Sequence, residues 1–321
     1  MGEGYTVAVV GAGLVGDRIV AELRRRDFPL KELRILARSA RTATLAGEDF
    51  EVGVAEPEAF EGVDIAFFAG TEGEKGAAVQ LAGEAIARGA VVIDNGSDFR
   101  LDPDVPLVVP EVNAEAAKDH DGLIANANCS TTQMVVPLAP LSREFGLEKV
   151  VVSTYQAVSG SGRGGVEALE DGREDVYPRP IDRNAIPLIG GVGDDGYTTE
   201  ETKMRLETRK IMGLPDLDVF ATTVRIPVHT GHSESVYVEL EREATLDQVL
   251  EVFRSAPGVV FSGEAHDFPT PLEAAGDPNT FVGRVRVEGN VVQYWCVSDN
   301  LLKGAATNAV QIAEELVRAR V

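Results

Sequence analysis

The stretch Thr6-Val-Ala-Val-Val-Gly-Ala-Gly-Leu-Val-Gly16 decides the fold of the N-terminal part of this 321-residue chain. Its first five residues form a continuous apolar run, which is typical of a buried strand in a parallel sheet. An amphipathic helical run through Ile19 and Leu23 follows the third glycine. A strand, a G-x-G-x-x-G turn and a helix in this order form the dinucleotide-binding fingerprint, because the glycines let a pyrophosphate approach the helix N-terminus. We therefore predict a Rossmann-type, doubly wound parallel sheet.

Further strand and helix patterns extend this prediction as far as Asp94. The runs Leu33–Leu36, Asp64–Phe68 and Ala90–Asp94 read as strands separated by helices. In such a sheet the ligand crevice lies at the carboxyl ends of the strands. Gly70 follows one of these ends, and the segment 95–100 leaves another and places Arg100 near the crevice.

The end of the second strand bears on the choice of cofactor. An NAD-binding chain usually has Asp or Glu there to bind the ribose 2′-hydroxyl. This chain has Arg38, Ser39 and Arg41 instead. Cations and a hydroxyl suit a 2′-phosphate, so we expect NADP. For Arg41 taken alone, a solvated surface loop is an almost equally good interpretation.

The remainder of the chain predicts a second domain with a mixed or antiparallel sheet covered on one face. Thr198-Thr-Glu-Glu201 predicts a capping box that opens a helix running to Met212. The glycines of 159–165 predict a mobile loop, and a long terminal helix is expected from about Lys303. The expected strands are Lys149–Gln156, Val219–Val228, Ser233–Glu241, Val259–Ser262, Phe281–Glu288 and Val291–Val297.

Length and hydrophobic content support two cores. The chain is too long for one ordinary core, and 44% of its residues are hydrophobic. We expect a dinucleotide-binding domain over 1–128 and a catalytic and dimerisation domain over 129–302. The C-terminal helix, 303–321, is expected to return to the first domain.

Composition argues against several classes of partner and site. The formal net charge is −22, which argues against nucleic acids and anionic membranes. No apolar run approaches the roughly 20 residues of a membrane-spanning helix, and we see no signal peptide. Cys129 and Cys296 make no disulfide framework, so we expect a cytoplasmic location. The histidines and cysteines show no metal-ligand spacing, so no metal site is expected.

The stretch Asn126-Ala-Asn-Cys-Ser-Thr-Thr-Gln133 points to nucleophilic chemistry. Cys129 lies where a polar run ends and an apolar helical run begins, and a helix N-terminus favours the thiolate. The best candidate for its proton partner is His232. The alternative is that Cys129 is a buried, inert residue, the commoner fate of a cytosolic cysteine. We favour the nucleophile because polar, helix-starting residues flank it.

Several separated motifs, spread in order over nearly the whole chain, resemble those of the aspartate-semialdehyde dehydrogenase family. They are Asp94-Asn-Gly-Ser-Asp-Phe-Arg100, Val109-Pro-Glu-Val-Asn113, Asn128-Cys-Ser-Thr131, Ser153-Thr-Tyr-Gln-Ala-Val-Ser-Gly160, Gly231-His-Ser-Glu234 and Ser298-Asp-Asn-Leu-Leu-Lys-Gly-Ala305. One departure is the glycine loop, which is one residue shorter than the family's usual form and lacks its hydroxyl.

The resemblance implies a role for each matching residue. Cys129 is expected to be the nucleophile, His232 the acid/base, and Gln156 the residue that orients the acyl group. The implied substrate and phosphate residues are Asn128, Arg225 for the carboxylate, Glu200 for the amino group, and Arg100 and Lys203 for phosphate. The expected cofactor residues are Gly11, Gly13, Leu14, Val15, Gly16, Arg38, Ser39, Arg41, Gly70, Ser159, Gly160 and Asn300.

The resemblance also implies an activity. The expected reaction is the reversible, NADPH-dependent reductive dephosphorylation of L-4-aspartyl phosphate to L-aspartate 4-semialdehyde, through a cysteine thioester. It belongs to the biosynthesis of lysine, methionine, threonine, isoleucine and diaminopimelate. Two alternatives stay open: an N-acetyl-γ-glutamyl-phosphate reductase of the same mechanism, and a catalytically silent paralogue. A homodimer or homotetramer is expected.

Overall fold

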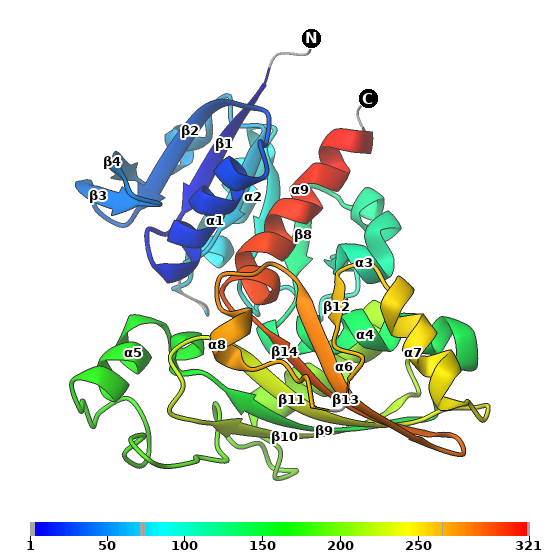
Figure 1. The fold of residues 1–321 in the computed structure, drawn as a ribbon. Coiled ribbons are helices and arrows are strands. Elements are labelled where there is room, and N and C mark those ends of the chain that lie inside the picture. The colour runs from blue at the N-terminus through cyan, green and yellow to red at the C-terminus, as the bar shows by residue number, and fades with distance from the viewer. Residues whose placement is uncertain (1–3, 71–72, 74, 265, 320–321) are drawn as a thin grey trace. The chain divides into compact units, whose positions relative to one another are not determined.

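The computed structural model describes residues 4–70, 73, 75–264 and 266–319. Contacts between residues divide the chain into two compact units. Unit 1 comprises 1–127 and 305–321, and unit 2 comprises 128–304. Each unit has its own sheet (Figure 1) and its own hydrophobic core.

The described part of unit 1 contains an eight-stranded sheet in the order β3-β4-β2-β1-β5-β6-β8-β7. All neighbouring strands are parallel except β3 and β4, which form an antiparallel pair. The predicted Rossmann-type sheet is confirmed, and the β3–β4 pair is an addition that the sequence patterns did not reveal. The strands are β1 Tyr5–Val10, β2 Leu30–Ala37, β3 Arg41–Leu45, β4 Glu48–Val54, β5 Ile65–Phe68, β6 Val91–Asp94, β7 Leu107–Val108 and β8 Leu123–Asn126.

The terminal helix α9 belongs to unit 1 and lies beside α1 in Figure 1. Ile19 and Leu23 of α1 share one buried core with Val310 and Ala313 of α9, because both helices have an apolar face at helical spacing. The helices are α1 Leu14–Arg25, α2 Ala77–Ala87, α3 Pro110–Asn113 and α9 Thr307–Ala319, with 3₁₀ turns η1 Pro57–Phe60 and η2 Ala114–Asp119.

Unit 2 contains a six-stranded sheet in its described part, in the order β10-β9-β11-β14-β13-β12. The pairs β9–β10 and β12–β13 are parallel and the others are antiparallel, which confirms the expected mixed sheet. The strands are β9 Lys149–Gln156, β10 Asp218–Arg225, β11 His232–Glu239, β12 Val259–Phe261, β13 Thr280–Glu288 and β14 Val291–Ser298.

Three helices cover one face of this sheet: α4 Cys129–Phe145, α6 Thr199–Met212 and α7 Leu246–Ser255 (Figure 1). Strand residues alternate between the two faces. Val150 and Val152 of β9 are buried in the core beneath the helices, whereas Val151 is 39% exposed. The remaining helices of the unit are α5 Gly162–Glu170 and α8 Pro271–Ala274, with the 3₁₀ turn η3 Val158–Ser161.

Three local expectations differ from the structure. Strand β10 ends at Arg225 and not at Val228, because Pro227 has no N–H to donate to a ladder. The segment 159–165 is not a loop: it lies in η3 and α5, where Val158 and Ala168 pack with Ile181. The terminal helix is preceded by a π-helical turn, Leu302–Ala306. None of the described helices combines the length and apolarity needed to cross a membrane.

Candidate functional site

Cys129 is the first residue of α4, as the sequence predicts. Asn128 caps the helix: its Oδ1 accepts hydrogen bonds from the backbone N–H groups of Ser130 at 3.0 Å and Thr131 at 3.1 Å. Asparagine is among the preferred N-cap residues because its side chain satisfies these otherwise unpaired donors. Cys129 is a free cysteine of intermediate exposure. Its sulfur therefore belongs to a helix N-terminus, which stabilises a thiolate.

Glu200 joins the N-cap to Gln156. Its Oε1 accepts hydrogen bonds from Asn128 Nδ2 and from Gln156 Nε2, each at 3.0 Å. Lys203, on the same helix, lies 3.8 Å from the other carboxylate oxygen. Burial, the largest influence, acts to raise the pKa of Glu200, but Lys203, the two amides and Arg225 together hold that pKa below its ordinary value. Glu200 is therefore a buried carboxylate that stays ionised at neutral pH.

His232 is the first residue of β11 and is fully buried. The backbone N–H of Ala157 donates a hydrogen bond to its Nδ1 at 3.0 Å. Because Nδ1 is an acceptor, the proton of the neutral ring must lie on Nε2. Nε2 has no hydrogen-bond partner among the described residues. Burial, and then the nearby Arg225, lower the pKa of His232 well below 6.5, so the ring is a neutral donor at Nε2.

Arg225, the last residue of β10, is buried beside this ring. Its Nη1 donates to the carbonyl oxygen of Ala157 at 2.6 Å, whereas its buried Nε has no partner among the described residues. Gly160 lies against both side chains. A Cβ added there would come within 2.9 Å of Arg225 Nη1 and 3.2 Å of His232 Nε2, so only glycine leaves the space in front of them open.

Asn300 and Ser159, both expected at the nicotinamide, bond each other in unit 2. Asn300 Nδ2 donates to Ser159 Oγ at 3.0 Å, and Asn300 Oδ1 accepts from the backbone N–H of Gly231 at 2.9 Å. This pair fixes the backbone immediately before His232.

The glycine loop of unit 1 has the geometry of a phosphate cradle. Gly11 has φ +115°, a conformation that favours glycine. A Cβ on Gly16 would overlap the carbonyl oxygen of Gly11, so the loop and the first turn of α1 approach more closely than any larger residue permits. Gly13 is the N-cap of α1, and Leu14 and Val15 begin that helix. This close approach of loop and helix is what a bound pyrophosphate requires.

Arg38, Ser39 and Arg41 are exposed and follow the carboxyl end of β2. In the sheet Val10 pairs with Leu36, so these residues leave the same edge as the glycine loop. No acidic residue occupies the positions from Ala37 to Arg41. Gly70 follows β5 at this edge as well.

Arg100 is buried in unit 1. Its Nε donates to the carbonyl oxygen of Asn126, and its Nη2 donates to that of Asn95, each at 2.8 Å. These bonds orient the guanidinium. Its role toward phosphate stays a prediction.

Comparison with known proteins follows the same division of the chain. Residues 6–120 match the family model described as semialdehyde dehydrogenase, NAD binding domain, and residues 138–303 match semialdehyde dehydrogenase, dimerisation domain. The aspartate-semialdehyde dehydrogenase of Bacillus subtilis (strain 168) is 47% identical over 343 aligned positions, covering 98% of each chain. That of Aquifex aeolicus (strain VF5) is 46% identical, also covering 98% of each.

The chain belongs to the aspartate-semialdehyde dehydrogenase family.

Solved structures agree with this assignment. The aspartate semialdehyde dehydrogenase II of Vibrio cholerae, complexed with ASA, has a TM-score of 0.94 and 40% identity, covering 99% of both chains. The aspartate semialdehyde dehydrogenase of Candida albicans, solved with NADP, has a TM-score of 0.75 and 25% identity, covering 98% of both. As a member of this family, the chain is an oxidoreductase that acts on an aldehyde group.

Within this dehydrogenase, sequence reasoning missed three positions that shape the site. Ala157 donates to His232 through its backbone, and Glu207 accepts from the backbone N–H of Asn128 at 2.7 Å. A Cβ on Gly304 would lie 2.8 Å from the Cβ of Cys129. A backbone donor has no sequence signal. For Glu207, its spacing of seven from Glu200 was an available signal, because residues two turns apart share a helix face.

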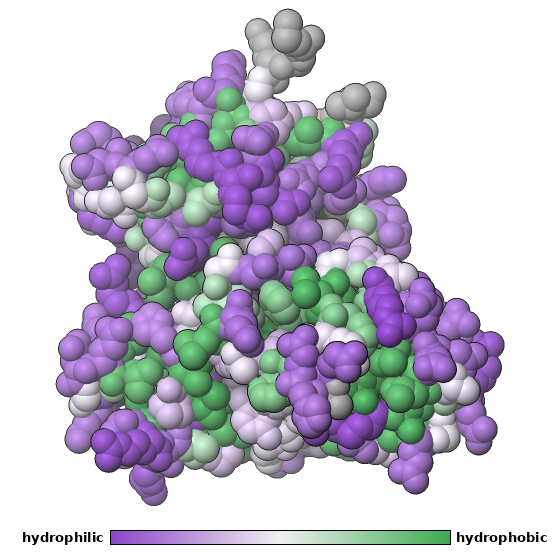
Figure 2. Space-filling view, in the orientation of Figure 1, coloured by the Kyte–Doolittle hydropathy of each residue, from purple (hydrophilic) through white to green (hydrophobic). Residues whose placement is uncertain are grey.

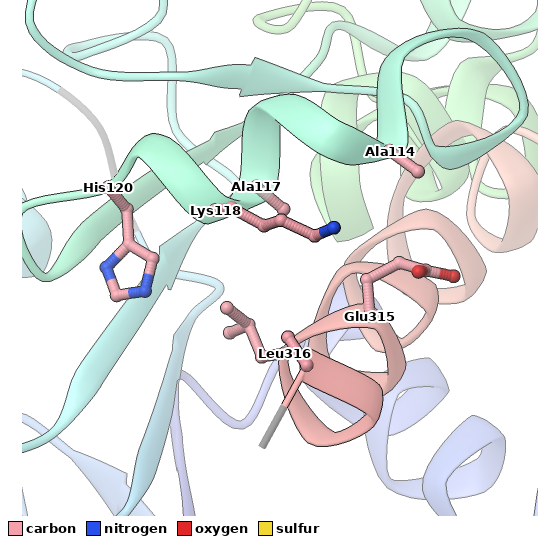
Figure 3. A pocket seen from close by; sticks show the side chains of 7 residues that line it. Ala114, Ala117, Lys118, His120, Glu315 and Leu316 are labelled. Atoms are coloured by element: carbon pink, nitrogen blue, oxygen red, sulfur yellow. The ribbon is translucent and has the colours of Figure 1, made fainter. Parts of the chain in front are cut away.

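Other cysteine and histidine side chains of the described residues have different surroundings. Cys296 is fully buried in β14, and His229 is exposed and pairs with Glu170 at 3.2 Å. His120 lines a hollow of about 160 Å³ in unit 1, between η2 and the end of α9 (Figure 3). None of the predicted site residues lines this hollow. In the described part of the chain, no three histidine, cysteine or acidic residues are grouped as metal ligands.

Proposed function

We propose that this chain catalyses the reversible, NADPH-dependent reductive dephosphorylation of L-4-aspartyl phosphate to L-aspartate 4-semialdehyde. One observation carries the proposal: a single network in unit 2 joins the N-cap before Cys129 to Glu200 and Gln156. The next residue, Ala157, bonds both His232 and Arg225. The proposed nucleophile, a hydrogen-bond donor, a cation and an anion are thereby joined in one network.

Cys129 is the nucleophile in this proposal. Its thiolate attacks the acyl carbon of the acyl phosphate, forming a thioester and releasing phosphate. A thiolate suits this role because it is both a strong nucleophile and a good leaving group. Lys203, and Arg100 of unit 1, are the proposed phosphate-binding cations, since ionised donors make the strongest hydrogen bonds to phosphate oxygens.

The cofactor fits the glycine loop and the residues after β2. Gly11, Gly13 and Gly16 would hold the pyrophosphate of NADP, and Arg38, Ser39 and Arg41 would hold its 2′-phosphate. Ser159, Gly160 and Asn300 are the proposed nicotinamide residues. Bound NADPH supplies the hydride that reduces the thioester carbon.

His232 is the proposed hydrogen-bond donor to the reacting oxygen. Reduction of the thioester leaves a tetrahedral alkoxide on Cys129, which collapses to the aldehyde and the free thiolate. A neutral ring with its hydrogen on Nε2 stabilises the oxyanion by donating a hydrogen bond, as preorganised donors do. In the reverse direction the same nitrogen polarises the aldehyde oxygen for attack by the sulfur. Neither role requires a charged ring before the reaction.

Glu200 and Arg225 favour an amino acid with free charges. The Nε of Arg225, which has no partner among the described residues, supports binding of the α-carboxylate. The ionised, buried Glu200 supports binding of an ammonium group. An N-acetylated substrate has no ammonium group to pair with Glu200, which weighs against an N-acetyl-γ-glutamyl-phosphate reductase.

We further propose that the catalytic form is a cytoplasmic homodimer, with 1–128 as cofactor domain, 129–302 as catalytic and dimerisation domain and 303–321 as a helix of the first. The match of 138–303 to a dimerisation domain supports this, as do exposed apolar residues of the sheet face, Val151 and Phe220. Figure 2 also shows hydrophobic side chains at the surface over α8 and around β12 and α7. Light scattering would distinguish a dimer from a tetramer.

Initial rates test the proposed reaction. Purified protein is assayed with aspartate semialdehyde and with N-acetylglutamate semialdehyde, with NADP and with NAD, and with and without inorganic phosphate. We expect reduction of NADP with aspartate semialdehyde that depends on phosphate. Preference for the acetylated substrate would support the sister enzyme, and inactivity with both would support a silent paralogue.

A further inference from the structure

Helix α6 holds the N-cap of α4 at two points. Glu200 accepts from the side-chain amide of Asn128 at 3.0 Å, and Glu207 accepts from its backbone N–H at 2.7 Å. The two glutamates are seven residues apart, so both project from the same face of α6. All three residues are buried, with Glu207 only 1% exposed.

The contact with Glu207 is distinct from ordinary helix capping. The side-chain oxygen of Asn128 already accepts from Ser130 and Thr131, and its carbonyl oxygen accepts from Thr132 N and Oγ1 at 2.8 and 2.9 Å. The backbone N–H of an N-cap residue lies outside the helical pattern and, when buried, needs a partner of its own. Glu207 supplies that partner from a different helix.

Two attachments constrain more than one. If only the side-chain amide of Asn128 were bonded to α6, rotation about the side-chain torsions would still let its backbone move relative to α6. A bond to its backbone N–H fixes the peptide group next to Cys129. With both in place, the first turn of α4 has a set position and orientation relative to α6, to Gln156 and hence to the backbone that bonds His232.

We propose that Glu207 is a positioning residue for the nucleophile: it holds the start of α4 so that the sulfur of Cys129 stays where the helix N-terminus stabilises its thiolate. Glu207 acts through Asn128 and touches no reacting atom. The inference rests on the proposed function only for its effect on turnover, because the reactivity of the sulfur can be measured without any substrate.

Three variants of the full-length protein separate the hydrogen bond from the charge. Glu207→Ala removes the acceptor, Glu207→Gln keeps a neutral oxygen in the same place, and Glu207→Asp keeps the charge but shortens its reach. Glu251→Gln, at an exposed glutamate of α7, is the matched control. Each is measured for melting temperature, kcat and KM, and the rate of iodoacetamide alkylation of Cys129 against pH. The Cys129→Ala variant gives the background alkylation.

We expect the alanine and aspartate variants to alkylate Cys129 more slowly at neutral pH, with the midpoint of the pH profile raised. Their kcat should fall by roughly 10- to 100-fold, as a displacement of about 1 Å at a reacting group can cause, with KM nearly unchanged. The glutamine variant should retain most of the wild-type kcat and alkylation rate, as should Glu251→Gln.

Three results would overturn the proposal. The first is a folded alanine or aspartate variant with wild-type alkylation and kcat. The second is a glutamine variant as impaired as alanine, which would assign the effect to charge. The third is a change confined to KM. If the alanine variant does not fold, the contrast between aspartate and glutamine decides. A wild-type protein that alkylates readily at Cys129 but fails with aspartate semialdehyde would refute the proposed function and leave this inference standing.

Discussion

The candidate cofactor residues of unit 1 are backbone positions and exposed side chains, whereas the candidate catalytic residues of unit 2 are mainly buried side chains. In unit 1 the loop 11–16 requires glycines because a Cβ on Gly11 or Gly16 would clash with the backbone. Arg38 and Ser39 are exposed. In unit 2 Glu200, Arg225 and His232 are each less than 10% exposed. Glu200 accepts a hydrogen bond from Gln156, and the adjacent Ala157 bonds both His232 and Arg225. A substitution in unit 1 should therefore change cofactor binding, and one in unit 2 should change turnover.

The largest expected effect is that of Cys129→Ala in unit 2. Without the sulfur no thioester forms, so kcat should fall by about 10⁴-fold or more. The affinity for NADP, measured by fluorescence titration, should stay within about twofold, because α1 and its glycine loop are untouched.

The control for this variant is Cys296→Ala, at the buried cysteine of β14. It should lower the melting temperature and keep kcat. Turnover by Cys129→Ala, or its loss in a folded Cys296→Ala protein, would contradict the assignment of the nucleophile.

A second test adds one methyl group beside two candidate site residues, Arg225 and His232. Gly160→Ala places a Cβ 2.9 Å from Arg225 Nη1 and 3.2 Å from His232 Nε2. We expect kcat/KM for aspartate semialdehyde to fall by about 100-fold, since small displacements of reacting groups are costly. Steady-state kinetics measure this effect.

Gly164→Ala is the matched control within α5, because its Cβ would meet nothing closer than 3.7 Å. It should leave activity intact, and the melting temperatures of the two variants are compared directly. Equal activity of the two variants would show that the space beside Gly160 is not used by substrate.

A smaller effect should separate two glycines of the unit 1 loop. Gly16→Ala forces the loop and α1 apart and should lower stability by about 1–3 kcal/mol, as overpacking does. Gly13→Ala meets nothing within 4 Å, so the fold should keep its stability. Its methyl group would still stand where we propose that the pyrophosphate binds, and it should raise the Kd for NADP by roughly tenfold.

Urea unfolding and NADP titration of both variants measure these effects. Turnover at saturating NADP should change little in Gly13→Ala. A Gly13→Ala protein that binds NADP like the wild type would argue against the cradle.

The smallest effect concerns the pH dependence of stability. Since the folded pKa of His232 lies below 6.5, the unfolded chain binds a proton there that the folded protein does not. Wild-type stability should therefore fall as pH drops below 6.5 toward the folded pKa, by up to about 1.4 kcal/mol per pH unit. His232→Gln should lack this part of the slope.

The difference between the two proteins isolates the imidazole. Glu234, whose pKa burial raises well above 4.5, acts in the opposite direction but is present in both. Unfolding by urea at several pH values gives the comparison. Parallel stability curves for the two proteins would contradict a buried, neutral imidazole.

Prediction from sequence succeeded where a pattern reports one local conformation. The apolar run before Gly11 and the capping box at Thr198 each require one kind of element, and both formed as expected. The pattern failed at 159–165, where four glycines suggested a loop but the packing of Val158 and Ala168 produced short helices. Glycine content indicates which backbone conformations a segment can adopt, and packing determines which of them it adopts.

The site shows the same limit at closer range. Cys129 and His232 were proposed as site residues from their motifs, and the N-terminal position of the cysteine in α4 followed from the residues around it. The neutral state of His232 was not predictable, because it depends on burial and on the nearby Arg225. The position of its proton depends on the backbone N–H of Ala157, which follows β9. Gly304 was likewise missed, since its closeness to Cys129 arises from a contact between residues 175 positions apart.

By itself the sequence determined the order of strands and helices, the dinucleotide loop and the residue types available for chemistry, because these depend on short-range periodicity and on side-chain identity. The tertiary structure alone decided which of these groups meet: α6 brings Glu200 and Glu207 to the start of α4, and Ala157, directly after β9, presents a backbone donor to His232. The physical reason is that hydrogen bonds and pKa values depend on distances of a few ångströms between residues far apart in the chain, which local patterns do not encode.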